Sequence, residues 1–160
     1  MSPPAGNTPL GHGFPNVSEA NAGAILTIDL DAVCANYRLL RDRLSGAEAA
    51  AVVKADAYGL GVDRVAPALA HAGCRVFFVA HIEEGMRLRQ ILNDSGEAEF
   101  VQAEIHILNG LLKGAEDAYD ASRLVPVLGS LDEIHNWKNY CQRLDRPLPC
   151  DIHADTGMLR

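Results

Sequence analysis

The sequence has no long apolar run, no paired cysteines and no excess of positive charge, and each absence excludes a class of protein. No stretch approaches the roughly 18–20 consecutive apolar residues of a membrane span, and the N-terminal segment lacks the apolar core of a signal peptide. The cysteines are scattered and form no C-x-x-C pair (Cys34, Cys74, Cys141 and Cys150). We therefore predict a cytoplasmic protein with reduced thiols and no membrane partner.

Positive charge is scarce over the whole chain. There are 14 Lys and Arg residues against 21 Asp and Glu, which gives a net charge of −7. Because nucleic acids and anionic membranes are bound through basic patches, neither is a predicted partner. The histidines show no ligand spacing, so no metal site is predicted. With 48% hydrophobic residues, the chain has enough apolar material for one core.

Residues 1–22 differ in composition from the rest of the chain. They include four prolines and three glycines and have little to bury. We predict that they form a disordered extension, and that residues 23–160 form the folded domain.

Residues 23–160 alternate short apolar runs with segments of helical periodicity. The expected strands cover residues 25–30, 49–53, 75–80, 104–108, 124–128 and 150–154, and Asp31 is the expected N-cap of the first helix. Pro126 favours a strand edge or a bulge in its run. Short connections between strands and helices indicate a parallel α/β sheet with right-handed crossovers. Counted from residues 49–53, five such strands fit either a small doubly wound domain or five of the eight units of a (β/α)8 TIM-type barrel.

The segment Ala51–Gly61, AVVKADAYGLG, is the best candidate for chemistry. An apolar run ends in Lys54, which places this side chain at the carboxyl end of a buried strand, where α/β folds carry their active sites. An amine in apolar surroundings is more often in its reactive free-base form, so Lys54 is a candidate Schiff-base nucleophile. A solvated surface lysine is the alternative.

The string VVKADAYGLG closely resembles the pyridoxal-phosphate lysine segment of the alanine racemase family. Leu60 is its one departure, because that family commonly has histidine there. The resemblance implies that this chain is the N-terminal portion of the racemase barrel, a partial (β/α)8 TIM-type barrel. It also implies that Lys54 is the catalytic lysine, which carries pyridoxal 5′-phosphate as an internal aldimine, and that Tyr58 binds the cofactor's phosphate. A loop aromatic that packs on the next helix is the alternative for Tyr58.

The closing segment Asp155–Arg160, DTGMLR, follows the expected strand 150–154. Alone it is typical of a turn, but it is similar to the D-T-G-M-x-R segment of the same family. The resemblance implies that Arg160 hydrogen-bonds the cofactor's phenolic oxygen and that Arg160 and Met158 contact the substrate. His153 stands where that family often has a lysine that orients the arginine.

The implied activity is interconversion of L-alanine and D-alanine through a carbanion at Cα. Racemisation needs a second acid–base group opposite the lysine, and the resemblance assigns it to a tyrosine on a C-terminal β domain of the partner subunit. The complete protein is thus expected to be a homodimer that acts on a small amino acid. This chain has no such domain, so the 160 residues alone are expected to be inactive. The alternatives are a non-catalytic pyridoxal-phosphate-binding barrel and a truncated remnant.

Overall fold

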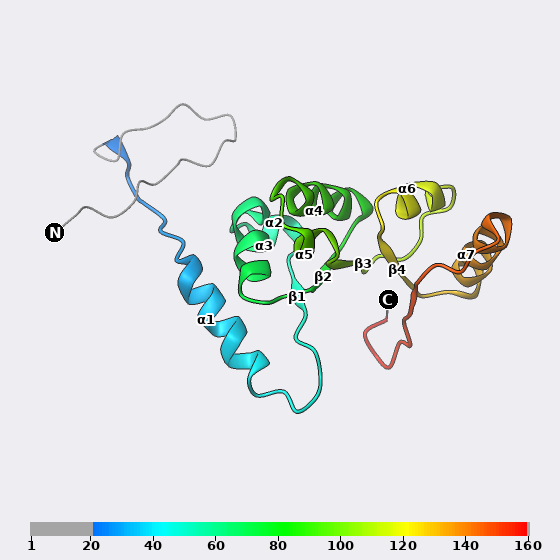
Figure 1. Ribbon diagram of the computed structural model, residues 1–160, viewed down its shortest axis with the longest axis horizontal. Coiled ribbons are helices and arrows are strands. Elements are labelled where there is room, and N and C mark those ends of the chain that lie inside the picture. The colour runs from blue at the N-terminus through cyan, green and yellow to red at the C-terminus, as the bar shows by residue number, and fades with distance from the viewer. Residues whose placement is uncertain (1–20, 160) are drawn as a thin grey trace.

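The computed structural model describes residues 21–159, which fold around one five-stranded sheet (Figure 1). Its strands are all parallel, as predicted, and they are ordered β1-β2-β3-β4-β5 across the sheet. They are β1 Ala51–Val52, β2 Val76–Val79, β3 Glu104–Ile107, β4 Val125–Leu128 and β5 Asp151–Ile152. The helices are α1 Leu30–Arg41, α2 Lys54–Tyr58, α3 Val62–His71, α4 Ile82–Asp94, α5 Ala98–Val101, α6 Glu116–Ala121 and α7 Leu131–Leu144.

The two faces of the sheet have different environments. Alternate residues of β2 and β3 are at most 1% exposed and belong to the hydrophobic core (Phe77, Val79, Ile105 and Ile107). The other face carries Val52, Phe78 and His106, which lie in register across β1, β2 and β3. Val52 is 44% exposed, so this second face is only partly covered in residues 21–159. In a closed barrel it would face the interior.

The prediction of a strand over residues 25–30 is wrong. Ile25 and Leu26 are 61% and 80% exposed, and this segment pairs with none of the five strands. Helix α1 begins at Leu30, and its N-cap is Asp29, whose carboxylate accepts the Ala32 N–H at 2.9 Å. Asp31, the predicted cap, lies within the first turn. Without a neighbouring strand, residues 25–29 have no sheet hydrogen bonds to make, and the cap two residues earlier sets the start of the helix.

Pro126 lies in β4, which is an interior strand and not an edge. Pairing with β3 ends at Pro126 itself, opposite Ile107, and pairing with β5 starts at Val127. The missing proline N–H therefore falls where the strand changes partners, which explains why the sheet tolerates it.

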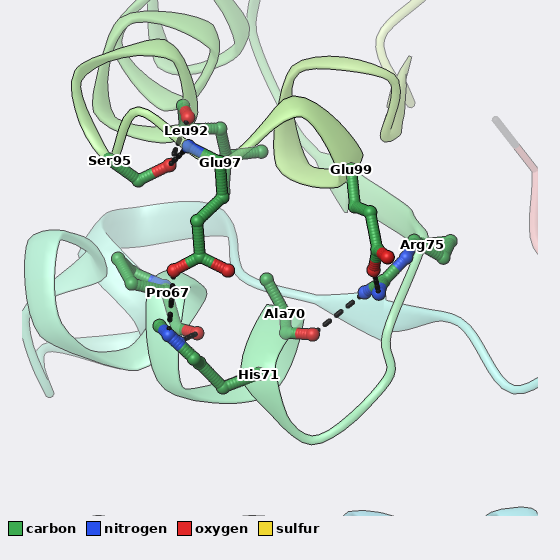
Figure 2. A network of polar contacts seen from close by, with 8 residues as sticks. All are labelled: Pro67, Ala70, His71, Arg75, Leu92, Ser95, Glu97 and Glu99. Atoms are coloured by element: carbon green, nitrogen blue, oxygen red, sulfur yellow. Dashed lines mark hydrogen bonds and ion pairs between the residues drawn. The ribbon is translucent and has the colours of Figure 1, made fainter.

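Polar side chains join the helices at the amino ends of the strands (Figure 2). His71, the last residue of α3, pairs with Glu97 at 2.9 Å, and Arg75, just before β2, pairs with Glu99 of α5. Both basic side chains also contact the Phe100 ring, His71 edge-on at 4.7 Å and Arg75 at 5.8 Å. These side chains therefore join the helices at the amino ends of the strands, away from Lys54 at the carboxyl end of β1.

None of the helices in residues 21–159 is long and apolar enough to cross a bilayer. Of the extension predicted for residues 1–22, residues 1–20 lie outside the described part of the chain.

Candidate functional site at the carboxyl ends of the strands

Lys54 lies at the carboxyl end of β1, as the sequence predicted. The preceding residue is still part of the sheet, because the Val53 N–H donates to the Phe78 carbonyl at 2.9 Å. Lys54 is half-buried, and no other residue of 21–159 makes a hydrogen bond or ion pair with its amine. The amine is thus held at the rim of the sheet without a partner among residues 21–159.

A left-handed turn follows Lys54. Ala55, Asp56, Ala57 and Tyr58 have φ values of 51°, 54°, 54° and 57°. None is glycine, and each such residue costs about 1–2 kcal/mol relative to right-handed geometry. Ala57 is buried, and its N–H donates to the Val53 carbonyl at 3.0 Å. Backbone strain of this kind concentrates at functional sites and persists only where surrounding contacts enforce it.

Tyr58 and Leu60, at the end of this turn, have different environments. Tyr58 is 62% exposed, four residues after Lys54 on the same turn, so its hydroxyl is open to a ligand. Leu60 is partly buried and packs against the core. The leucine that replaces the family's usual histidine therefore serves as a packing residue.

Glu84, in the first turn of α4, contacts the left-handed turn of residues 55–58 (the lysine turn) from a neighbouring helix. One carboxylate oxygen accepts the Ala55 N–H at 2.6 Å, and the other accepts the N–H groups of Ala80 and His81 at 2.8 and 3.1 Å. Burial raises the pKa of Glu84, but these three hydrogen bonds outweigh it and lower the pKa below its ordinary value. Sequence reasoning missed this role, since its only signal was an acidic residue at the start of a helix.

A second polar group lies on the partly covered face of the sheet. His106 of β3 is 7% exposed, stacks on Phe78 at 4.6 Å, and contacts Asp151 of β5 through Nδ1 at 2.6 Å. Its Nε2 lies 3.3 Å from Glu104. The histidine ties β3 to β5 below the rim, and nothing in the spacing of the histidines indicated it.

The closing segment lies on the same rim as Lys54 but at the opposite edge of the sheet. Strands β1 and β5 are separated by three others, so at about 4.8 Å per spacing they stand up to about 19 Å apart. Met158 is 76% exposed, and its N–H donates to Asp155, as does that of Gly157, at 2.8 and 2.9 Å. Lys54 and Tyr58 therefore lie on one turn at the end of β1, whereas Met158 lies on the segment that follows β5. Arg160 lies outside the described residues.

A cavity of about 410 Å³ opens between the ends of β3, β4 and β5. Its polar lining includes Asn109, Ser130, Glu133 and His153. His153 is half-buried, and its Nε2 is buried without a hydrogen-bond partner in residues 21–159. Within that part of the chain, no group of three or more His, Cys, Asp or Glu side chains could hold a metal ion.

Comparison with known proteins gives a consistent result. The family described as alanine racemase, N-terminal domain, matches residues 28–160. The chain is 51% identical over 138 residues to the alanine racemase of Methylobacterium nodulans, covering 86% of this chain and 35% of that protein. It is 47% identical over 139 residues to that of Brucella ovis, covering 87% of this chain and 33% of that protein.

Solved structures show the same likeness. The alanine racemase of Bartonella henselae with covalently bound pyridoxal phosphate superposes with a TM-score of 0.75 and 42% identity, covering 83% of this chain and 35% of that one. For that of Streptomyces coelicolor the TM-score is 0.72 at 31% identity, covering 83% and 34%. The five-stranded sheet thus matches part of a racemase barrel, which decides against a doubly wound domain. The chain spans about a third of the length of these relatives.

Proposed function

This chain belongs to the family of the alanine racemase N-terminal domain, and we propose that it is the cofactor-binding segment of an enzyme that interconverts L-alanine and D-alanine. Its relatives are named for that activity, and one of them holds pyridoxal phosphate covalently. The activity, the amino acid substrate and the homodimer are proposals for the whole protein, of which this sequence matches only part of the barrel.

The observation that carries the proposal is the strained turn beside an unengaged amine. Lys54 stands at the rim where barrel enzymes react their substrates, and four consecutive left-handed residues follow it. The residues present fit pyridoxal phosphate: Lys54 offers an amine for its aldehyde, and Tyr58 offers an exposed hydroxyl as a donor to its phosphate.

In the proposed reaction the bound cofactor supplies an electron sink for the negative charge that develops at the substrate's α-carbon. Lys54 would hold the cofactor through its amine, and the same amine would take a proton from one face of that carbon or return it there. Tyr58 would donate a hydrogen bond to the phosphate. Arg160 is assigned to the cofactor's phenolic oxygen, and Arg160 and Met158 to the substrate, on the motif they share with the family.

A second acid–base group must act on the opposite face of the α-carbon, because inversion needs removal and return of the proton on different sides. The proposal assigns it to a tyrosine of a C-terminal domain in the partner subunit. Racemisation would then need both subunits, whereas attachment of the cofactor to Lys54 would need only this chain.

Attachment can be tested on the 160-residue chain itself. The chain has three lysines, Lys54, Lys113 and Lys138, and the latter two are exposed internal controls. After incubation with pyridoxal 5′-phosphate, reduction with borohydride and peptide mapping, we expect label mainly on Lys54, at least about tenfold above either control lysine. The variant Lys54→Arg should lose this label and leave the low background on Lys113 and Lys138.

Equal labelling of all three lysines would contradict the proposal, because it would mean that the fold does not distinguish Lys54. Selective label on Lys54 without racemase activity in the complete protein would instead favour a non-catalytic cofactor-binding barrel.

A further inference from the structure

Two side chains of helix α4 contact two consecutive residues of the lysine turn, Ala55 and Asp56. Glu84 accepts the Ala55 N–H at 2.6 Å, and Arg87, one helical turn further on, lies 3.4 Å from the Asp56 carboxylate. We propose that Glu84, assisted by Arg87, is a positioning residue that holds the left-handed turn and thereby aims Lys54. The inference rests on the proposed role of Lys54 and adds to it the element that sets its orientation.

The geometry of the peptide explains how a contact at Ala55 acts on Lys54. The Ala55 N–H belongs to the planar peptide group that joins it to Lys54. Fixing the direction of that N–H fixes the plane of the group, and with it the ψ angle of Lys54 and the path of the chain into the turn. The Ala55 residue itself is exposed, so the Glu84 oxygen is the contact that immobilises this N–H.

The strain of the turn makes such a contact necessary. Four non-glycine residues in left-handed geometry are disfavoured by roughly 4–8 kcal/mol together. Hydrogen bonds within the turn offset part of this, such as those from Gly59 to Ala55 at 3.0 Å and from Gly61 to Asp56 at 2.9 Å. The contacts of Glu84 and Arg87 come from another element, α4, so they couple the turn to that helix, in addition to the Val62 N–H of α3, which donates to Asp56.

Arg87 makes the weaker of the two contacts. Its guanidinium also pairs with Asp63 at 3.0 Å, and the Asp56 oxygen that it approaches already accepts the Val62 N–H at 3.0 Å. All three charged side chains are more than a third exposed, so solvent screens the attraction. Arg87 therefore assists, and Glu84 carries most of the constraint.

The position needs a carboxylate and not merely a polar side chain, because both of its oxygens accept. One oxygen serves Ala55, and the other serves Ala80 and His81 at the start of α4. Glutamine has only one acceptor oxygen. It would turn this oxygen to the two N–H groups of the helix start and present its NH2 group to the Ala55 N–H. The substitution Glu84→Gln thus breaks the tie to the lysine turn and preserves the helix cap.

Helix α7 supplies a matched control. Glu133 occupies the corresponding place in its first turn, three residues after the N-cap Ser130, and accepts the Gly129 N–H at 2.7 Å. Its carboxylate lies against Gly110, where an added Cβ would come within 2.7 Å of it. Glu133→Gln therefore removes an equivalent charge at an equivalent helix position, beside β3 and β4 and away from the lysine turn.

The experiment compares wild type, Glu84→Gln, Glu133→Gln and Arg87→Gln as 160-residue chains. Loss of a charge-assisted hydrogen bond changes the equilibrium constant between the closed and open states of the turn about tenfold. We therefore expect the Ala55 amide of Glu84→Gln to exchange its hydrogen about tenfold faster by NMR, without cofactor present. The ratio of label on Lys54 to label on Lys113 should fall about fivefold to tenfold. Arg87→Gln should lower the ratio about twofold, and Glu133→Gln should leave both measurements unchanged.

The two readouts separate this inference from the proposed function. If wild type labels Lys54 selectively but Glu84→Gln keeps the same ratio and the same Ala55 exchange, the positioning role is overturned and the function stands. If wild type shows no selectivity for Lys54, the proposed function fails and the positioning role falls with it, whatever the Ala55 exchange shows. If Glu84→Gln does not fold, Arg87→Gln decides, because an unchanged ratio in that variant overturns the coupling of α4 to the turn.

Discussion

Charged side chains of α4 contact both ends of the strands. An acidic side chain lies at the carboxyl ends (the carboxyl edge) and a basic one at the amino ends (the amino edge), and the two differ in burial. At the carboxyl ends, Glu84 of α4 accepts from Ala55, Ala80 and His81. At the amino ends, Arg89 of α4 donates to the carbonyls of Val101, Ala103, Ser122 and Arg123 at 2.8–3.1 Å. Glu84 is half-buried, whereas Arg89 is 6% exposed.

The difference separates stability from function. At the amino ends the Arg89 guanidinium binds the carbonyls that end α5 and α6, the negative ends of those helices, and Figure 2 shows a second set of polar ties at this edge. Burial, and secondarily the charge of Arg123, lower the pKa of Arg89 to about 10, so it remains charged at neutral pH. At the carboxyl ends the fold instead keeps a strained turn and an unengaged amine. In barrels this is the edge that carries the chemistry.

Removing Arg89 should weaken only the contacts at the amino ends of the strands. Its effect on the free energy of unfolding should be the largest of those expected. Arg89→Met leaves buried carbonyls without donors, at about 1–3 kcal/mol each, partly offset because the guanidinium no longer has to be buried and because Arg123 still donates to Val101. We expect the free energy of unfolding to fall by about 3–4 kcal/mol in urea denaturation, and the label ratio of Lys54 to Lys113 in the folded fraction to stay unchanged.

Two further variants test this expectation for Arg89→Met. Arg38→Met on the exposed face of α1 should change stability by less than about 0.5 kcal/mol. Arg89→Lys retains the charge but only three donors, and should fall between wild type and Arg89→Met. A large change in the Lys54 ratio for folded Arg89→Met would show that the two edges are not independent.

Substitution of Gly85, which lies between the two charges on α4, should disturb both edges. A Cβ on Gly85 would come within 2.6 Å of the Ile107 side chain and 3.2 Å of the Leu124 side chain, so either α4 or these side chains must move. Overpacking costs about 1–3 kcal/mol, and the better helix propensity of alanine returns up to about 1 kcal/mol. We expect Gly85→Ala to lose about 1–2 kcal/mol by urea denaturation and to lower the Lys54 label ratio. A gain in stability would mean that Ile107 and Leu124 rearrange to accept the methyl group.

The alternation of strands and helices and the parallel direction were predictable from the sequence, because each βα unit carries its own apolar run and helical period. The strand order was not, because five such units fit a doubly wound sheet as well as a barrel. The start of α1 was harder to predict, since Asp29 and Asp31 are equally suitable N-caps. Which of them caps the helix depends on whether residues 25–29 pair with another strand. The position of Pro67, the sixth residue of α3, was equally hard to predict, because proline is best tolerated in a first turn. Element existence follows from local pattern, whereas exact bounds depend on neighbours.

The sequence predicts only those features of the site that depend on residue type and spacing. A lysine at a strand end and a tyrosine four residues later are visible in the sequence. The handedness of the turn is not, because alanine and tyrosine do not favour it and the residue that enforces it lies 29 positions away. The burial of Arg89 is equally hidden, because its partners are backbone carbonyls, which any residue supplies.

Acid should weaken the contact between Glu84 and the lysine turn at the carboxyl edge, and this is the smallest of the expected effects. The pKa of Glu84 is lowered on folding, so its contribution to stability is present above its ordinary pKa of 4.5 and is lost as pH falls through the folded value. Because Glu84 is only partly buried and shares its surroundings with His81, Arg87 and Asp56, we expect less than about 1 kcal/mol. The measurement is Ala55 amide exchange, corrected for intrinsic rates, from pH 6 downward. In wild type its protection should fade below pH 4.5, whereas Glu84→Gln should show low protection throughout. Protection that persists in wild type after Glu84 is protonated would mean that the turn holds itself and that the carboxyl edge, like the amino edge, does not depend on this charge.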